Sequence, residues 1–352
     1  MQTVYEMIDN KKIHKDDFDV ALIPGKRDEL KHVYGQFRLE ERSAQRDIEG
    51  AQSNTDVVFE DIDNCPLCGA TSNESDNIYH IHGMEIVSCC SCSFIYSRQV
   101  FDRNYDQSHY ANKRISDMQV LLKNHPIYAN LDSTKCRYAL QSISAHSSPP
   151  GTLLDVGSAT GTLLFEGRNA GWEVFGVEVS VPQANIAIRK GLRVLHGYFP
   201  NVCSSFQQES FPQTFDVITL FDVLEHILKP KAFITEIRRR LNPGGILAIQ
   251  VPNIDSLIIR LEGRDSSNFC VGHWMHFSHR TLRRMLEDSG FECLTMETYI
   301  SELDRINSFS DATLTAMSGE ISETQDSLKL PISAQNLHNA MMGYKLFGVF
   351  RN

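Results

Sequence analysis

A short run of small residues between two apolar segments constrains the fold of this chain more than any other feature. Residues 152–156 are mostly apolar and strand-like, residues 157–161 are small, and a second apolar strand covers 173–179 after a helical stretch. Small residues let the backbone turn sharply, so that a ligand can lie against bare peptide N–H groups at a helix N-terminus. The pattern predicts a β-loop-α-β unit with a ligand-binding turn.

The glycine spacing indicates which ligand suits this turn. The pattern is Asp155-x-Gly157-x-x-x-Gly161, and Ala159 stands where the dinucleotide fingerprint G-x-G-x-x-G could place a glycine, so NAD is disfavoured. Glu178 ends the next strand, where a carboxylate can accept hydrogen bonds from ribose hydroxyls. An ordinary βαβ turn that needs glycine only for its geometry is the alternative interpretation.

These residues resemble motif I and the following acidic residue of the class I S-adenosylmethionine (SAM) dependent methyltransferases. The resemblance implies SAM as the cofactor. The expected cofactor-binding residues are Asp155, Gly157, Ser158, Gly161, Glu178, Phe221 and Asp222.

Strand and helix patterns alternate after residue 151, which predicts a parallel sheet covered on both faces. The expected fold class is α/β, a Rossmann-like seven-stranded methyltransferase sheet with helices on both faces and a small N-terminal zinc ribbon. The expected strands cover 152–156, 173–179, 192–196, 215–221, 245–251, 291–299 and 343–350, with helices near 162–170, 182–190, 230–241 and 279–289. Residues 301–340 are expected to form a partly helical insertion.

Two C-x-x-C pairs precede this domain, Cys65 with Cys68 and Cys89 with Cys92. Each pair can present two sulfurs to one tetrahedral ion, and the residues between the pairs can form the short strands of a ribbon. Four thiolates leave no open position, so the predicted zinc is structural. Chance surface thiols, the alternative, would not explain two pairs in one short segment.

Four segments are expected in the chain. Residues 1–62 form a polar extension with a helix near 28–48, and 63–97 form the zinc ribbon. Residues 98–150 form a helical linker or substrate lid, in which Tyr105 and Tyr110 are candidate pocket residues; packing at the junction is as good an explanation for either tyrosine. Residues 151–352 form the SAM-binding domain.

Glu225 and His226 follow the fourth strand of the domain, where ligands bind in open α/β sheets. His226 is the candidate base, and Glu225 can orient it or the acceptor; capping of the next helix is the alternative. A histidine group at 273–279 contains no carboxylate, which favours a pocket wall or proton-transfer role for His276 over a metal site. A purely structural role for His276 is equally compatible.

Together, the ribbon, the tyrosine-bearing linker, the strand-turn at 153–164, and the segments VLEHI and GHWMHFSHRTLRRMLEDSGFE are similar to zinc-ribbon methyltransferases that include sugar 3-C-methyltransferases. The resemblance covers about 65–300 and implies roles for Glu225, His226, Tyr105 and Tyr110 in enolisation and substrate binding. Two departures weaken the ketosugar assignment: this chain ends soon after the seventh strand, and Ala159-Thr160 replaces an Asn-Asp pair. Other small-molecule acceptors, at oxygen or nitrogen, are therefore equally compatible.

A net charge of −10 disfavours nucleic acid as the main partner. The N-terminus lacks a signal-peptide pattern and no apolar run reaches membrane-spanning length, so a cytoplasmic protein without a membrane partner is expected. The sequence predicts a SAM-dependent methyltransferase with a small-molecule acceptor: a sugar, glycan precursor or natural-product intermediate. A non-catalytic scaffold that docks through the ribbon, or a nucleic-acid methyltransferase, is the alternative, and the oligomeric state stays open.

Overall fold

The computed structural model describes residues 12–26, 35, 59–81, 83–101, 120–123, 125–323 and 332–352. The expected helix near 28–48 lies almost wholly outside this part of the chain. Tyr105 and Tyr110 also lie outside it, so their proposed contact with the acceptor stays a prediction.

A seven-stranded sheet forms the centre of the fold, in the order β12-β13-β10-β9-β6-β7-β8. Neighbours among β6 to β10 pair in parallel, while β13 runs antiparallel to both β10 and β12. The strands are β6 (Thr152–Val156), β7 (Glu173–Glu178), β8 (Val194–His196), β9 (Phe215–Phe221), β10 (Leu241–Pro252), β12 (Glu292–Tyr299) and β13 (Lys345–Arg351). All seven expected strands are confirmed.

The strand order changes direction at β6. From this strand the chain builds outward through β7 and β8 on one side, and returns to β9 and β10 on the other. Ligands of open α/β sheets bind at such a switch point, outside the carboxyl ends of the strands. The turn after β6 and the residues after β9 therefore meet at one edge of the sheet.

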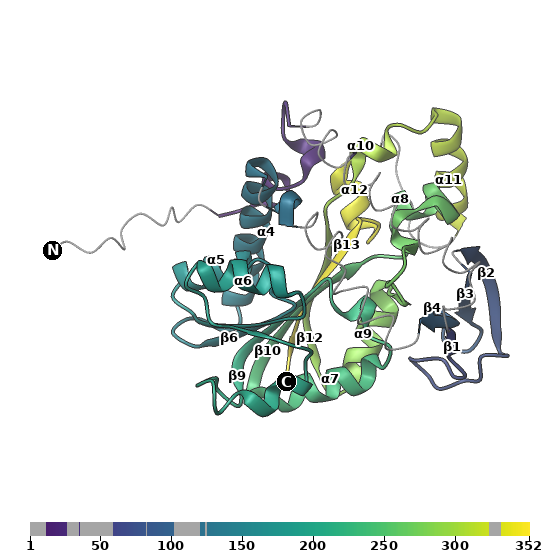
Figure 1. Cartoon of the computed structure of the whole chain (residues 1–352). Coiled ribbons are helices and arrows are strands. Elements are labelled where there is room, and N and C mark those ends of the chain that lie inside the picture. The colour runs from purple at the N-terminus through teal and green to yellow at the C-terminus, as the bar shows by residue number, and fades with distance from the viewer. Residues whose placement is uncertain are drawn as a thin grey trace.

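Helices cover both faces of the sheet, as predicted (Figure 1). Leu153 and Val217 belong to the core beneath α4 (Pro126–Ser144), α5 (Thr162–Asn169) and α6 (Val181–Arg189). Their neighbours Leu154 and Ile218 point to the other face, where they share a core with α7 (Pro230–Arg239) and α9 (His279–Asp288). This alternation follows from the two-residue period of a strand whose two faces are both buried.

The start of β10 differs from the expectation. Residues 242–245 were expected to end the preceding helix, with a strand from 245, but α7 ends at Arg239 and β10 begins at Leu241. Leu241 pairs with Phe215, and the register then shifts before Ile246 pairs with Val217. The strand absorbs the extra residues in a bulge, where Gly244 has a φ of 73°.

The cysteine-rich segment forms a four-stranded sheet in the order β11-β4-β3-β2. Three strands come from this segment: β2 (Ser75–Ile81), β3 (Met84–Cys89) and β4 (Ile95–Ser97). The fourth, β11 (Met275–His276), belongs to the segment after β10 and pairs antiparallel with β4. Beside this sheet, β1 (Phe59–Asp61) pairs with β5 (Gln99–Phe101). The ribbon is thus joined by backbone hydrogen bonds to the domain that carries the large sheet.

The expected insertion at 301–340 is partly helical in its described residues. It contains α10 (Leu303–Ile306), α11 (Asp311–Glu323) and α12 (Ala334–Asn339), and part of it packs with α8 (Leu257–Glu262) around a third apolar core. The described 3-10 turns are η2 (Lys15–Asp17), η3 (Val20–Leu22), η4 (Asn201–Ser205), η5 (Leu224–His226), η6 (Gly263–Asp265) and η7 (Ser267–Phe269). Among the described helices, none combines the length and apolar character that crossing a membrane requires.

Replacing Phe277 by alanine should destabilise the junction between the ribbon and the large domain. Phe277 is fully buried, and its ring centroid lies 5.2 Å from that of Phe94 in the ribbon. We expect Phe277→Ala to lower the free energy of unfolding by about 3 to 5 kcal/mol in urea titrations. The exposed Ile78→Ala should change it by less than about 0.5 kcal/mol. Equal stability of the two variants would contradict this packing.

Candidate cofactor and acceptor site

The turn after β6 is held by hydrogen bonds within the protein. The N–H groups of Gly157 and Ser158 donate to the Val177 carbonyl oxygen at 2.8 and 3.1 Å, and the Gly161 N–H donates to Ser158. The expectation of bare N–H groups facing a ligand is therefore wrong for these residues, because the neighbouring strand β7 already accepts two of these bonds. The feature that the turn does have is a tight backbone conformation, in which Gly157 and Gly161 have φ values of 81° and 82°.

The two glycines also permit close packing. A Cβ on Gly157 would lie 2.5 Å from a Val223 methyl group, and one on Gly161 would lie 2.4 Å from Leu192. Both distances are shorter than side chains tolerate, so each position needs glycine for space as well as for its positive φ. Ala159 also has a positive φ, 49°, which is unfavourable for a residue with a side chain.

Glu178 connects the turn to the end of β7. One carboxylate oxygen accepts the Ala159 N–H at 2.7 Å, and the other accepts the Ser180 N–H at 2.7 Å. The side chain is only 5% exposed. An ionised carboxylate has about four acceptor positions, so these two bonds leave capacity for two further donors.

Asp155 is buried beneath the turn at the end of β6. It is 4% exposed, and the Thr219 hydroxyl donates to its carboxylate at 2.6 Å. Burial raises the pKa of Asp155 to about 7, although the bond from Thr219 acts in the opposite direction. Near neutral pH this carboxyl group exchanges its proton readily.

Asp222 follows β9 in a left-handed conformation with a φ of 57°. Its carboxylate accepts hydrogen bonds from Lys345 at 2.8 Å and from the Gln250 amide at 2.6 Å. Burial alone would raise the pKa of Asp222, but the positive charges of Lys345 and Lys135 and these hydrogen bonds hold it well below its usual value. Phe221, the preceding residue, packs edge-on against Phe347.

Glu225 and His226 lie in η5, directly after β9. Glu225 is 1% exposed, and neither of its carboxylate oxygens has a hydrogen-bond partner in the part of the chain that the structure describes. Burial, and then the negative charge of Asp222, raise the pKa of Glu225 to about 8. Nδ1 of His226 lies 2.7 Å from the Gly272 carbonyl oxygen.

His273 joins this pair from the loop before β11. Its ring packs edge-on to that of His226, with centroids 4.8 Å apart. The side-chain ligand atoms of Glu225, His226 and His273 all lie within 4.8 Å of one another. Burial and the neighbouring His226 and Lys345 hold the pKa of His273 well below its usual value, which keeps the ring neutral. The histidine group thus meets a carboxylate in space, which corrects the reason given above for disfavouring a metal site there.

His276 lies on β11 and is 3% exposed. Its Nδ1 is 3.1 Å from the Asn268 side-chain amide, and burial lowers its pKa to about 3. His276 therefore stays neutral and is held by Asn268. Its proposed role in proton transfer to or from the acceptor remains a prediction.

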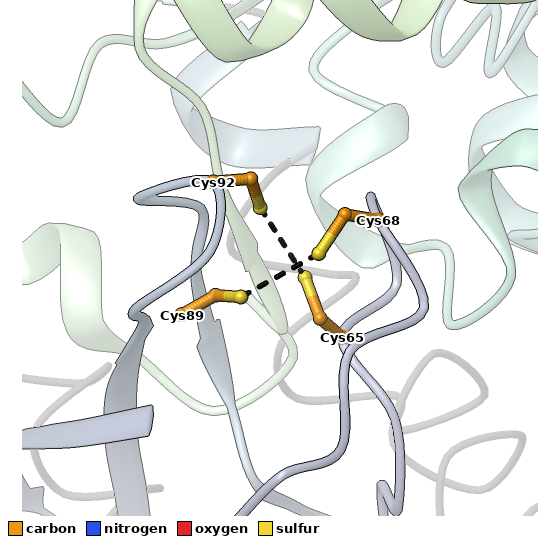
Figure 2. Close-up of side chains that lie close together, drawn as sticks. All are labelled: Cys65, Cys68, Cys89 and Cys92. Atoms are coloured by element: carbon orange, nitrogen blue, oxygen red, sulfur yellow. Dashed lines mark hydrogen bonds between the residues drawn. The ribbon is translucent and has the colours of Figure 1, made fainter. Parts of the chain in front are cut away.

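The four cysteines of the two C-x-x-C pairs converge on one point (Figure 2). The sulfur of Cys65 lies 3.6 Å from that of Cys92, and the sulfur of Cys68 lies 3.5 Å from that of Cys89. Sulfurs around a tetrahedral zinc ion stand roughly 3.8 Å apart, since each Zn–S bond is about 2.3 Å. The donor set and its spacing thus fit one zinc ion.

Several residues at the carboxyl edge of the large sheet could not be identified from the sequence as part of the candidate site. Lys345 reaches Asp222 from the last strand, 123 residues away. His273 stood in the recognised histidine group, but nothing in the sequence indicated that it, rather than His276, faces Glu225. The predicted residues Asp155, Gly157, Ser158, Gly161 and Glu178 do gather around the first turn. Phe221 ends β9, and Asp222, Glu225 and His226 follow it.

The chain is similar to known methyltransferases. Residues 128–296 match a family model described as a methyltransferase domain. A mitochondrial ubiquinone biosynthesis O-methyltransferase from Schizosaccharomyces pombe is 29% identical over 99 residues, which are 28% of this chain and 36% of that protein. The corresponding protein of Paraburkholderia xenovorans is 29% identical over 108 residues, 29% of this chain and 45% of that protein. The chain thus spans less than half the length of these relatives.

A crystal structure of a SAM-dependent methyltransferase from Archaeoglobus fulgidus aligns with 66% of this chain and 99% of its own, at 15% identity and a TM-score of 0.47. The residues that match the family model carry β6 to β10, and this part of the chain is similar to a methyltransferase domain. The large sheet has the Rossmann-like α/β arrangement of seven strands.

The raised pKa of Asp155 predicts a pH-dependent stability. Its carboxyl group ionises near 3.8 in the unfolded chain and near pH 7 in the folded protein, so stability contributed by the neutral form is lost as the pH rises through this window. Asp155→Asn stays neutral and should be more stable than the wild type at pH 8, by at most about 4 kcal/mol. The difference should nearly vanish at pH 4 in urea titrations.

The exposed Asp288→Asn serves as the control for this comparison, because its carboxyl group lies on the surface of α9. We expect it to change stability by less than about 0.5 kcal/mol at either pH. Equal stability of Asp155→Asn and the wild type at pH 8 would contradict the prediction that the ionised carboxylate of Asp155, buried beneath the turn, destabilises the folded protein.

Proposed function

We propose that this chain is a SAM-dependent methyltransferase that acts on a small-molecule acceptor. The observation that carries the proposal is the bond from the Ala159 N–H to Glu178, which makes the glycine turn and the acidic strand end one unit. The remaining acceptor capacity of Glu178 suits the two hydroxyls of a ribose. This unit lies at the same sheet edge as Glu225 and His226.

SAM, when bound, supplies a methyl group attached to a positively charged sulfur. The acceptor would lose a proton as it gains this methyl group. The protein contributes alignment of the acceptor with the methyl group and exclusion of water. We place the acceptor beside η5, where the loop that carries His273 lies against Glu225.

We assign removal of the acceptor's proton to His226. The Gly272 carbonyl oxygen can only accept a hydrogen bond, so Nδ1 of His226 carries the proton and Nε2 carries the lone pair of the neutral ring. A neutral imidazole of this tautomer can accept a proton at Nε2. Glu225 would orient the acceptor or the ring, and Tyr105 and Tyr110 remain candidates for contacts with the acceptor.

The acceptor that fits best is a sugar, a glycan precursor or a natural-product intermediate. The net charge of −10 weighs against a nucleic-acid acceptor. The two relatives named above are O-methyltransferases, which favours transfer to oxygen, whereas the resemblance to sugar C-methyltransferases favours carbon. A scaffold without activity is the second candidate, because the ribbon could serve for docking.

We further propose that Cys65, Cys68, Cys89 and Cys92 bind one structural zinc ion. Their sulfurs have the spacing of a tetrahedral site, and four protein ligands leave no position for a substrate. The ion would join the turn that contains Cys65 and Cys68 to the segment from Cys89 to Cys92, which connects β3 to β4. Since β4 pairs with β11, the ion would also stabilise the loop that carries His273.

Calorimetry with SAM tests the cofactor assignment. We expect the wild type to bind SAM and Glu178→Gln to bind it about 10 to 100 times more weakly, because hydrogen bonds to a charged group are lost. Glu173→Gln, a change on an exposed residue at the other end of the same strand, should bind like the wild type. Absence of binding by the wild type at millimolar SAM would exclude the methyltransferase function and favour the scaffold.

The base assignment can be tested with methyl-labelled SAM and a metabolite extract freed of protein and nucleic acid. We expect label to enter the small-molecule fraction, and His226→Ala to reduce the rate by about 100 to 10,000 times while SAM affinity is kept. Glu225→Gln should also slow transfer. Full rates in both variants would contradict the assignment, and label that enters only added nucleic acid would contradict the acceptor class.

Zinc content and stability test the cysteine site. The wild type should contain one tightly held zinc ion, and Cys68→Ser should lose it and unfold at lower urea concentration, since metal binding adds to folding free energy. Cys90→Ser is the matched control, because Cys90 is exposed and lies next to Cys89 without joining the cluster. Equal zinc content in the wild type and Cys68→Ser would overturn the assignment.

A further inference from the structure

The cluster of Glu225, His226 and His273 has the composition of a metal site. It combines two imidazoles and one carboxylate, and all three ligand atoms lie within 4.8 Å of one another. Ligand atoms that share an ion at about 2.1 Å stand roughly 3.4 Å apart in a tetrahedral arrangement. Small rotations of the side chains therefore bring the three groups to one ion.

The hydrogen bonds around the cluster orient both imidazoles for metal binding. Nδ1 of His226 lies 2.7 Å from the Gly272 carbonyl oxygen, and Nδ1 of His273 lies 3.1 Å from the Asn268 carbonyl oxygen. In both rings the proton is thus on Nδ1, and the lone pair is on Nε2. Histidines that bind metals characteristically donate their other N–H to a backbone carbonyl or carboxylate in this way.

Glu225 supplies the observation that points most directly to a ligand. Its carboxylate is 1% exposed, and neither oxygen has a hydrogen-bond partner among the described residues. Burial of a polar group without a partner destabilises a folded protein, so such groups are rare. Lys345, the nearest cation named above, is already paired with Asp222 at 2.8 Å. A bound cation would satisfy Glu225.

We propose that Glu225, His226 and His273 bind a divalent first-row metal ion, distinct from the zinc of the cysteine cluster. Two imidazoles and a carboxylate suit Zn²⁺, Fe²⁺, Co²⁺ or Mn²⁺ better than Ca²⁺ or Mg²⁺, which prefer oxygen ligands. Three protein ligands leave open positions, unlike the four thiolates. An oxygen of the acceptor could bind there.

This inference deepens the proposed function and rests on it for the place of the acceptor. A metal ion lowers the pKa of an oxygen ligand, which would ease loss of the acceptor's proton before methyl transfer. With the ion bound, Nε2 of His226 would hold the metal, so the proton of the acceptor would pass to solvent water instead of to His226. Metal binding and the base role of His226 are therefore alternatives, which metal-binding measurements distinguish.

The test is titration of the full-length, zinc-containing protein with CoCl₂, followed by calorimetry and visible absorption. We expect one Co²⁺ per chain in addition to the zinc, with the weak visible bands of nitrogen and oxygen ligands. Glu225→Gln and His273→Ala should each weaken binding more than about 100-fold, because loss of a direct ligand should exceed the 10- to 100-fold cost of losing an outer contact. His80→Ala, a surface histidine of the ribbon, should bind like the wild type.

Retained zinc and retained SAM affinity in the same samples show that each variant is folded. Absence of added Co²⁺ binding, equal affinity in all variants, or intense thiolate-to-cobalt absorption in place of the weak bands would overturn the proposal. None of these measurements requires methyl transfer, so a failure of the metal-site proposal can be distinguished from a failure of the proposed function. If SAM does not bind while Co²⁺ binds through Glu225 and His273, the methyltransferase function falls and the metal site stands.

Discussion

The backbone of Trp274 makes the connection on which the geometry of the site depends. Its N–H donates to the Glu225 carbonyl oxygen at 2.9 Å, and its carbonyl oxygen accepts the Ser97 N–H at 2.9 Å. One peptide segment thus joins the turn after β9 to the cysteine-rich sheet, and Figure 1 shows that sheet beside α9 at the edge of the large domain. Because His273 directly precedes Trp274 in the chain, the ribbon helps to fix its distance from His226. The cysteine-rich sheet can in this way position a residue of the candidate site.

Carboxyl groups at the carboxyl edge of the sheet differ in how their charge is compensated. Asp222 is matched by Lys345, and Asp155 receives a hydrogen bond from Thr219. Glu225 stands out among these carboxyl groups because both of its oxygens lack partners in the described chain. Folded proteins rarely leave buried polar groups unsatisfied, and this is the basis of the metal site proposed above. Glu178 anchors the glycine turn through two hydrogen bonds, and its carboxylate has acceptor positions for two further donors.

Much of the fold was predictable because local patterns determine it. The seven strands follow from apolar runs bounded by turn residues, and the Cys65–Cys68 and Cys89–Cys92 pairs follow from metal-ligand spacing. Predictions were wrong where one local sequence pattern is compatible with two different local structures. Residues 242–245 read as a helix stop, yet they lie in the irregular start of β10, where Gly244 and Gly245 form backbone hydrogen bonds with Asn352 after the last strand. The N–H groups of the glycine turn looked available to a ligand, yet Val177 on the adjacent strand accepts two of them.

The sequence by itself determined the class of sheet, the glycine turn with Glu178, the four cysteines and the Glu225–His226 pair, since each of these depends on residues close together in the chain. Only the tertiary structure decided what these groups meet. It brought His273 to Glu225 and Lys345 to Asp222, and it joined β4 to β11. The physical reason is that contacts between residues distant in the chain depend on how the sheets and helices pack against one another. Spacing along the chain carries no information about which of several histidines will face a given carboxylate.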